Sequence, residues 1–211
     1  MSLDTTKILT GVNYKNAQGE TSSYTLPVDR LQWKCDNIKS LAYECYDRKL
    51  NNLDEMFNGL DTSSVTDMHS MFFECKSFNQ DISEWNVSNV TDIYNMFREC
   101  KSFNQSLNNW DTSNVINMYG MFFGCESFNQ DISNWDVSKV TDMHSMFFGC
   151  ESFNQDISGW NVSNVTSMFS MFYWCKSFNQ DISGWDVSNI TNMGYIFNYC
   201  PIEEKYKPKF K

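Results

Sequence analysis

The most regular feature of the chain is a set of apolar positions that returns every 25 residues. This spacing is shared by a cysteine column (Cys75, Cys100, Cys125, Cys150, Cys175, Cys200), a tryptophan column from Trp85 to Trp185 and a phenylalanine column from Phe78 to Phe178. No insertion or deletion interrupts the period between Leu60 and Cys200. A unit of this size cannot bury its apolar face alone, so a fixed period indicates units that stack. We therefore expect equivalent side chains of consecutive coils to form continuous columns.

Two short elements are predicted in each coil. In residues 65–72, apolar side chains recur at i, i+3, i+6 and i+7, which favours a short helix with Thr66 as its N-cap. Trp85 and Val87 lie two positions apart, as in a strand with one buried face. Strands from successive coils would pair in parallel, about 4.8 Å apart. The predicted fold is a right-handed α/β solenoid, a leucine-rich-repeat-like arc with one short parallel strand and one short helix per coil.

The two ends of the chain depart from the repeat. Residues 1–50 are expected to form an N-terminal cap, with a hairpin between Ile8 and Leu26 and a helix between Leu31 and Leu50. Residues 51–200 form the array, and its first copy is degenerate. Pro201 stops the pattern, so residues 201–211 are expected to form a C-terminal cap and tail.

The repeat motif resembles that of a known family. Each copy approximates V-T-x-M-x-x-M-F-x-x-C-x-S-F-N-Q-D-I-S-x-W, which resembles the BspA-like leucine-rich repeat surface proteins, most of all their bacterial branch. The resemblance covers Leu50 to Phe210. It implies an arc with strands on its inner face, surface display or adhesion, and no catalytic residues. The chain differs in using phenylalanine, methionine and tryptophan where ordinary leucine-rich repeats use leucine.

Composition and charge narrow the classes of partner. An apolar content of 41% excludes a disordered chain, and no apolar run reaches the 18 residues or so that would insert in a membrane. The net charge is −10, and residues 61–200 hold 16 acidic and five basic residues. Such an acidic surface repels phosphate, so we expect no nucleic-acid partner. No signal peptide is visible; a cell-surface or secreted location follows from the resemblance, with the cytoplasm as the alternative.

Neither the cysteines nor the histidines indicate catalysis. The cysteine column is interpreted as buried free thiols, because no C-x-x-C spacing supports zinc. His69 and His144 lie three coils apart and cannot act as a pair. The redox state of Cys35 and Cys45, which fall outside the period, is left open. The chain is predicted not to be an enzyme.

A column of aspartates has two interpretations. Its members are Asp81, Asp131, Asp156 and Asp181, and Ser106 takes the equivalent place in one coil. Each carboxylate can accept a backbone N–H bond in its own turn, or neighbouring carboxylates can hold calcium between coils. We favour the turns, because Ser106 replaces one member without disturbing the period, and expect no cofactor.

Positions that vary between copies are the candidate binding surface. One set flanks the tryptophan column: Glu84, Asn86, Asn109, Asp111, Asn134, Asp136, Asn161 and Asp186. A second set, Phe73, Phe123, Phe148 and Tyr173, follows a core phenylalanine. This second set is a contact stripe if exposed and additional core if covered by the next coil. We expect a monomeric binding or adhesion module for a protein partner, with an intracellular interaction scaffold as the alternative.

Overall fold

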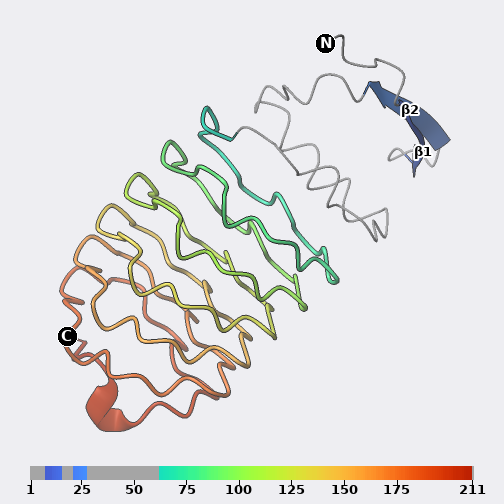
Figure 1. The fold of residues 1–211 in the computed structure, drawn as a ribbon. Coiled ribbons are helices and arrows are strands. Elements are labelled where there is room, and N and C mark those ends of the chain that lie inside the picture. The colour runs from blue at the N-terminus through green and yellow to red at the C-terminus, as the bar shows by residue number, and fades with distance from the viewer. Residues whose placement is uncertain (1–7, 16–20, 28–61, 211) are drawn as a thin grey trace.

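The computed structural model describes residues 8–15, 21–27 and 62–210 of the chain (Figure 1). Near the amino terminus, strand β1 (Ile8–Lys15) pairs antiparallel with β2 (Thr21–Pro27). The hairpin is expected between Ile8 and Leu26, and the two strands match these bounds except for Pro27, one residue beyond. The helix expected between Leu31 and Leu50 and the degenerate copy at residues 51–60 lie outside the described residues. The division into caps and array stays a prediction.

From residue 62 onward the chain runs through successive coils that lie side by side (Figure 1). A single parallel bridge joins each pair of coils, linking in turn Asp67, Asp92, Asn117, Asp142, Ser167 and Asn192. The N–H groups of Met68 and Ser70 also donate to carbonyls of the next coil at 2.9 and 2.7 Å. Because alternate N–H groups repeat this in each following junction, this part of each coil directs its donors toward the carboxyl-terminal end of the stack. The assignment to a right-handed leucine-rich-repeat-like solenoid stays a prediction.

The short helix expected in each coil is not formed. Residues 65–72 and their equivalents make consecutive hydrogen-bonded turns instead, in which Met71 donates to Met68 and Phe73 to Ser70. An α-helix would need the N–H of every residue for bonds inside the segment, whereas here alternate N–H groups bond the next coil. Ser70 and Glu74 also have φ values of 55° and 57°, in the left-handed region that a right-handed helix excludes.

The strand expected around Trp85 and Val87 is also not formed, because this part of the coil turns twice. Trp85 N–H donates to the Ile82 carbonyl at 3.1 Å, and Val90 N–H donates to the Val87 carbonyl at 2.9 Å. Both side chains are nevertheless buried. A spacing of two between buried residues can therefore arise from turns, and the parallel bridge falls on the Asp67 column instead.

The core consists of columns of identical or similar side chains. Two phenylalanine columns stack within and between coils: the Phe72 and Phe78 rings are 4.0 Å apart, and Phe72 and Phe97 are 5.5 Å apart. Most members of these columns are fully buried. The side-chain oxygen of Asn79 accepts the N–H of Asn104 at 2.8 Å, and this bond recurs at each equivalent junction up to the tail. Ring stacking and amide bonds together hold each coil against the next.

The tail after Pro201 covers part of the last coil. It contains one turn of 3-10 helix, η2 (Glu204–Tyr206). Ile182 N–H donates to the Tyr206 carbonyl at 3.0 Å, and Glu203 N–H donates to Asn179 at 2.9 Å. The Glu203 bond takes the place of the bond that a further coil would make to Asn179. Among the residues placed by the structure, no helix has the length and apolar character to span a membrane.

Candidate binding surface

The aspartate column sits in a series of exposed turns. Ser83 N–H donates to the Asp81 carboxylate at 2.9 Å, and the same bond recurs at Asp131, Asp156 and Asp181. Hydrogen bonds from these serines lower the pKa of each carboxyl below its ordinary value. These contacts support the turn interpretation. Over the ranges that the structure describes, no three histidine, cysteine or acidic side chains gather as a metal site.

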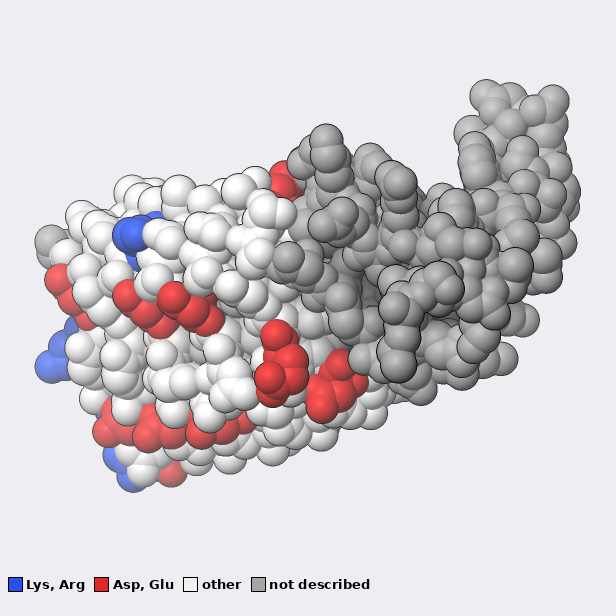
Figure 2. All heavy atoms as spheres, turned by 45° about the horizontal axis from the view of Figure 1, so that its top comes forward, with Lys and Arg blue, Asp and Glu red and all other residues white. Residues whose placement is uncertain are grey.

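The residues that flank the tryptophan column are exposed. Glu84, Asn109 and Asn134 precede the tryptophans, and the residues that follow are Asn86, Asp111, Asp136, Asn161 and Asp186. Each of the five side chains that follow a tryptophan accepts the N–H of a serine two positions later, at 2.9 to 3.2 Å. Figure 2 shows acidic side chains gathered in rows on the face it presents.

The second candidate set forms a continuous ladder with Arg98. The Phe123 and Phe148 rings are parallel with centroids 4.4 Å apart, and Phe148 and Tyr173 follow at 4.8 Å. The Arg98 guanidinium lies 3.8 Å from the Phe123 centroid and 5.9 Å from that of Phe73. All five side chains are half-buried. The rings cover one another and still present part of their surface to solvent. The set is therefore partly covered by neighbouring coils and partly an exposed contact stripe. We call these five residues the aromatic ladder.

A second column of rings lies four residues earlier in each coil. Its members are His69, Tyr94, Tyr119, His144 and Phe169, with neighbouring centroids 4.5 to 6.5 Å apart. All are half-buried. Partial burial lowers the pKa of His144, and the nearby Asp142 charge opposes this effect. This column is not among the binding candidates chosen from the sequence, although the aligned copies have a ring at this position in five coils.

The cysteine column offers no reactive group. Cys75 to Cys200 are free thiols, and all but Cys200 are buried. Each sulfur donates to a backbone carbonyl of an earlier residue; Cys125 Sγ lies 2.9 Å from the Phe97 oxygen. Burial raises the pKa of Cys125, Cys150 and Cys175 well above its usual value, which disfavours the thiolate needed for nucleophilic chemistry. Cys35 and Cys45 lie outside the described residues.

The carboxyl-terminal end of the stack exposes large apolar side chains. Met193, Tyr195, Tyr199 and Trp174 are 40%, 60%, 70% and 46% exposed. The Tyr199 ring lies 5.4 Å from Tyr173, so it extends the aromatic ladder onto the end. These residues are not among the candidates chosen from the sequence, because their exposure depends on where the tail lies.

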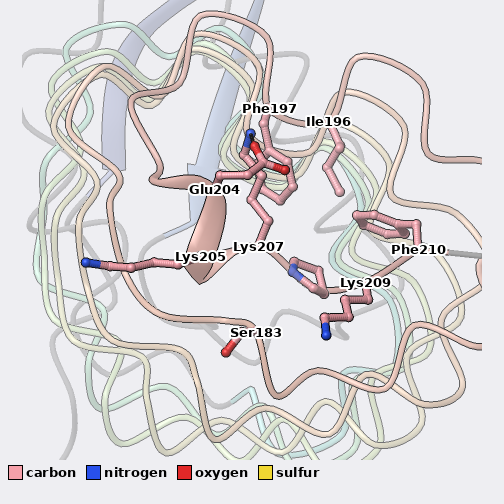
Figure 3. A pocket seen from close by; sticks show the side chains of 9 residues that line it. Ser183, Ile196, Phe197, Glu204, Lys205, Lys207, Lys209 and Phe210 are labelled. Atoms are coloured by element: carbon pink, nitrogen blue, oxygen red, sulfur yellow. Dashed lines mark hydrogen bonds and ion pairs between the residues drawn. The ribbon is translucent and has the colours of Figure 1, made fainter.

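A cavity of about 730 Å³ separates part of the last coil from the tail (Figure 3). Ile196, Phe197 and Phe210 contribute its apolar lining, and Lys207 and Lys209 contribute amines. Lys207 also pairs with Glu204 at 2.6 Å, which neutralises one of these amines.

One comparison with known proteins finds a relationship. The family model described as "Mycoplasma protein of unknown function, DUF285" matches residues 14–122 and again residues 104–207. The two matches together span nearly the whole chain. No curated protein and no solved structure matches the chain.

Proposed function

The chain belongs to the family described as Mycoplasma protein of unknown function, DUF285, and from this premise we propose that it is a non-enzymatic binding or adhesion module. It presents a repeat surface to a protein partner. The proposal includes the right-handed leucine-rich-repeat-like solenoid expected from the sequence. The observation that carries it is the aromatic ladder.

The aromatic ladder has the chemistry of a protein contact surface. Aromatic and arginine side chains contribute most to many protein interfaces, because they bury a large area with few rotatable bonds. Here the neighbouring rings already hold one another, with Phe123 and Phe148 parallel at 4.4 Å. Little side-chain entropy is left to lose on binding, which favours association.

The acidic turns support a partner with basic groups. Asp111 and Asp136 are exposed, and hydrogen bonds from Ser113 and Ser138 lower the pKa of both carboxyls, which keeps them charged at neutral pH. Exposed carboxylates attract a basic partner over a distance and speed its approach, while each exposed pair contributes little affinity. In this proposal the ladder supplies affinity and the carboxylates supply the association rate.

Capture of a partner and substitution at the ladder test this function. Immobilised chain is exposed to the proteins of its source cell and medium, and the captured protein is purified for measurement of its Kd. We expect the double substitution Phe123→Asn and Phe148→Asn to weaken this Kd about tenfold or more. Asn198 occupies the equivalent position in the last coil, so asparagine has a precedent there. Ile116→Thr, which removes an exposed apolar side chain elsewhere, is the matched control. An unchanged Kd in the double variant contradicts the ladder as the binding surface.

The place where the module acts is a separate part of the proposal. The resemblance to BspA-like proteins supports display on a bacterial cell surface, and an intracellular scaffold is the alternative. Protease added to whole cells separates the two. Digestion of the protein supports display, and complete protection in intact cells with digestion after lysis supports the scaffold.

A further inference from the structure

The last coil carries a row of backbone N–H donors. In each earlier coil, the equivalent donors bond the next coil. At the preceding junction, Met168, Ser170, Phe172 and Trp174 donate their N–H groups to carbonyls of Asn192, Gly194, Ile196 and Asn198, at 2.8 to 3.0 Å. The equivalent donors of the last coil are the N–H groups of Met193, Tyr195, Phe197 and Tyr199. None of these four has a hydrogen-bond partner among the residues that the structure describes. We call residues 192–199 the open edge.

The tail covers the end of the stack only in part. It bonds Ile182 and Asn179 through Tyr206 and Glu203, and the Lys207 amine lies 5.7 Å from the centroid of the Phe197 ring. Figure 3 shows the tail crossing the end of the stack, with η2 inside the outline of the coils. Within the described residues, the tail makes no hydrogen bond to the four donors.

The open edge lacks the features that usually prevent association at such a place. Exposed rows of backbone donors attract other chains, and proteins commonly protect them with charged side chains or proline. Residues 192–199 contain no charged residue and no proline. Trp174 and Tyr199 occupy one position of the 25-residue repeat, and earlier coils have Glu74 and Glu99 at the same position. Acidic groups thus give way to exposed rings toward the end of the stack.

We propose that the open edge is a docking site for an apolar segment of a partner protein that adopts the turned backbone conformation of residues 142–148. The segment supplies carbonyl oxygens at alternate residues to the four donors and lays its side chains on Met193, Tyr195 and Tyr199. The chain itself shows this arrangement at its internal junctions, where alternate carbonyls and stacked rings meet such a row of donors. This mode of recognition adds a segment to an edge through main-chain bonds. It goes beyond the proposed function, because it concerns the end of the stack and holds whether or not the aromatic ladder binds.

Donor geometry excludes one competing occupant. Two copies meeting symmetrically at this edge would bring N–H groups against N–H groups, because a two-fold contact places the same surface on both sides. The occupant must present carbonyls, as the segment of each following coil does inside the stack.

A peptide copied from an internal coil tests the proposal. Residues 141–149 contribute the carbonyls of Asp142, His144, Met146 and Phe148 to the preceding coil at 2.7 to 3.1 Å. This peptide is added at millimolar concentration to the whole isotope-labelled chain, and amide hydrogen exchange is followed residue by residue. We expect exchange at Met193, Tyr195, Phe197 and Tyr199 to slow about tenfold or more, because bonded amides are protected. A scrambled peptide of the same composition should leave these amides unchanged.

Two substitutions taken from earlier coils separate this edge from the ladder. Tyr195→Ser and Tyr199→Glu, made together, restore the residue types of Ser170 and Glu99, which have nearly the same φ at the equivalent positions. We expect this pair to weaken peptide binding about tenfold or more, whereas Ile116→Thr and the Phe123→Asn, Phe148→Asn variant retain it. Absence of peptide binding overturns the proposal. So does binding without protection of the four amides, or equal protection by the scrambled peptide.

Discussion

The indole Nε1 of Trp135 donates a hydrogen bond to the Leu107 carbonyl in the preceding coil, at 3.1 Å. Both residues are buried, with Trp135 4% exposed. The same bond joins Trp110 to Ile82, Trp160 to Ile132 and Trp185 to Ile157. The tryptophan column therefore links each coil to its neighbour by a polar bond as well as by apolar packing.

We predict that Trp135→Phe lowers the free energy of unfolding by about 1–3 kcal/mol, because the buried Leu107 carbonyl loses its donor. Chemical denaturation followed by circular dichroism measures the change. Trp174→Phe is the control, since Trp174 is 46% exposed and should change stability by less than about 0.5 kcal/mol. Equal effects of the two substitutions would show that the indole bond contributes little.

The buried thiols should resist alkylation in the native chain. Burial raises the pKa of Cys125, Cys150 and Cys175 well above the ordinary value and that of Cys200 to about 11. The thiolate is the reacting form, so raising the pH from 7 to about 9 adds little reactivity while the fold persists. Iodoacetamide labelling, read for each cysteine by mass spectrometry, should modify the first three only after denaturant is added. Labelling of Cys150 under native conditions would contradict this prediction.

Sequence and structure agree most closely where a property depends on the period. The cysteine, tryptophan and phenylalanine columns follow directly from the 25-residue spacing, because stacked units place equivalent side chains together. Free thiols at Cys75 to Cys200 and serine-bonded carboxylates at Asp81 and its equivalents follow from the same logic.

Local structure within one coil was predicted less well, because two conformations fit the same spacing. Apolar residues such as Met68, Met71 and Phe72 suit a helical face, yet they also suit consecutive turns. The choice between them depends on bonds to the next coil, as the N–H of Met68 shows by donating to Asp92. The open edge was beyond prediction for a related reason, since it depends on the path of the tail after Pro201.

Acid should weaken the turns at the aspartate column. Hydrogen bonds from serines lower the pKa of Asp81, Asp131 and Asp156 below 3.8 in the folded chain. A depressed carboxyl pKa stabilises the fold above the unfolded value, and this stabilisation is lost as the pH falls through the folded value. Stability should therefore decline as the pH drops below about 4. Denaturation midpoints between pH 7 and pH 2 measure the decline.

Substitutions at one of these aspartates separate charge from hydrogen bonding. Asp131→Asn should change stability little at pH 7, because Asn86 and Asn161 accept the same kind of serine bond in their own turns, and it should reduce the acid sensitivity. Asp131→Ala removes the acceptor; because the group is exposed and screened by solvent, the loss should stay below about 1 kcal/mol. If asparagine and alanine were equally destabilising at pH 7, the hydrogen bond would not be the stabilising contact.

Two glycines, Gly149 and Gly159, should respond differently to substitution by alanine. Gly149 has a φ of 69°, whereas a Cβ added at Gly159 would meet only open space. We predict that Gly149→Ala lowers the free energy of unfolding by about 1 kcal/mol, because a left-handed conformation strains any residue with a Cβ and this strain exceeds the entropy that alanine removes from the unfolded chain. Gly159→Ala should be neutral or slightly stabilising for the same entropic reason. Thermal and chemical denaturation of the two variants decide the matter, and a Gly149→Ala variant as stable as Gly159→Ala would show that the backbone relaxes at this turn.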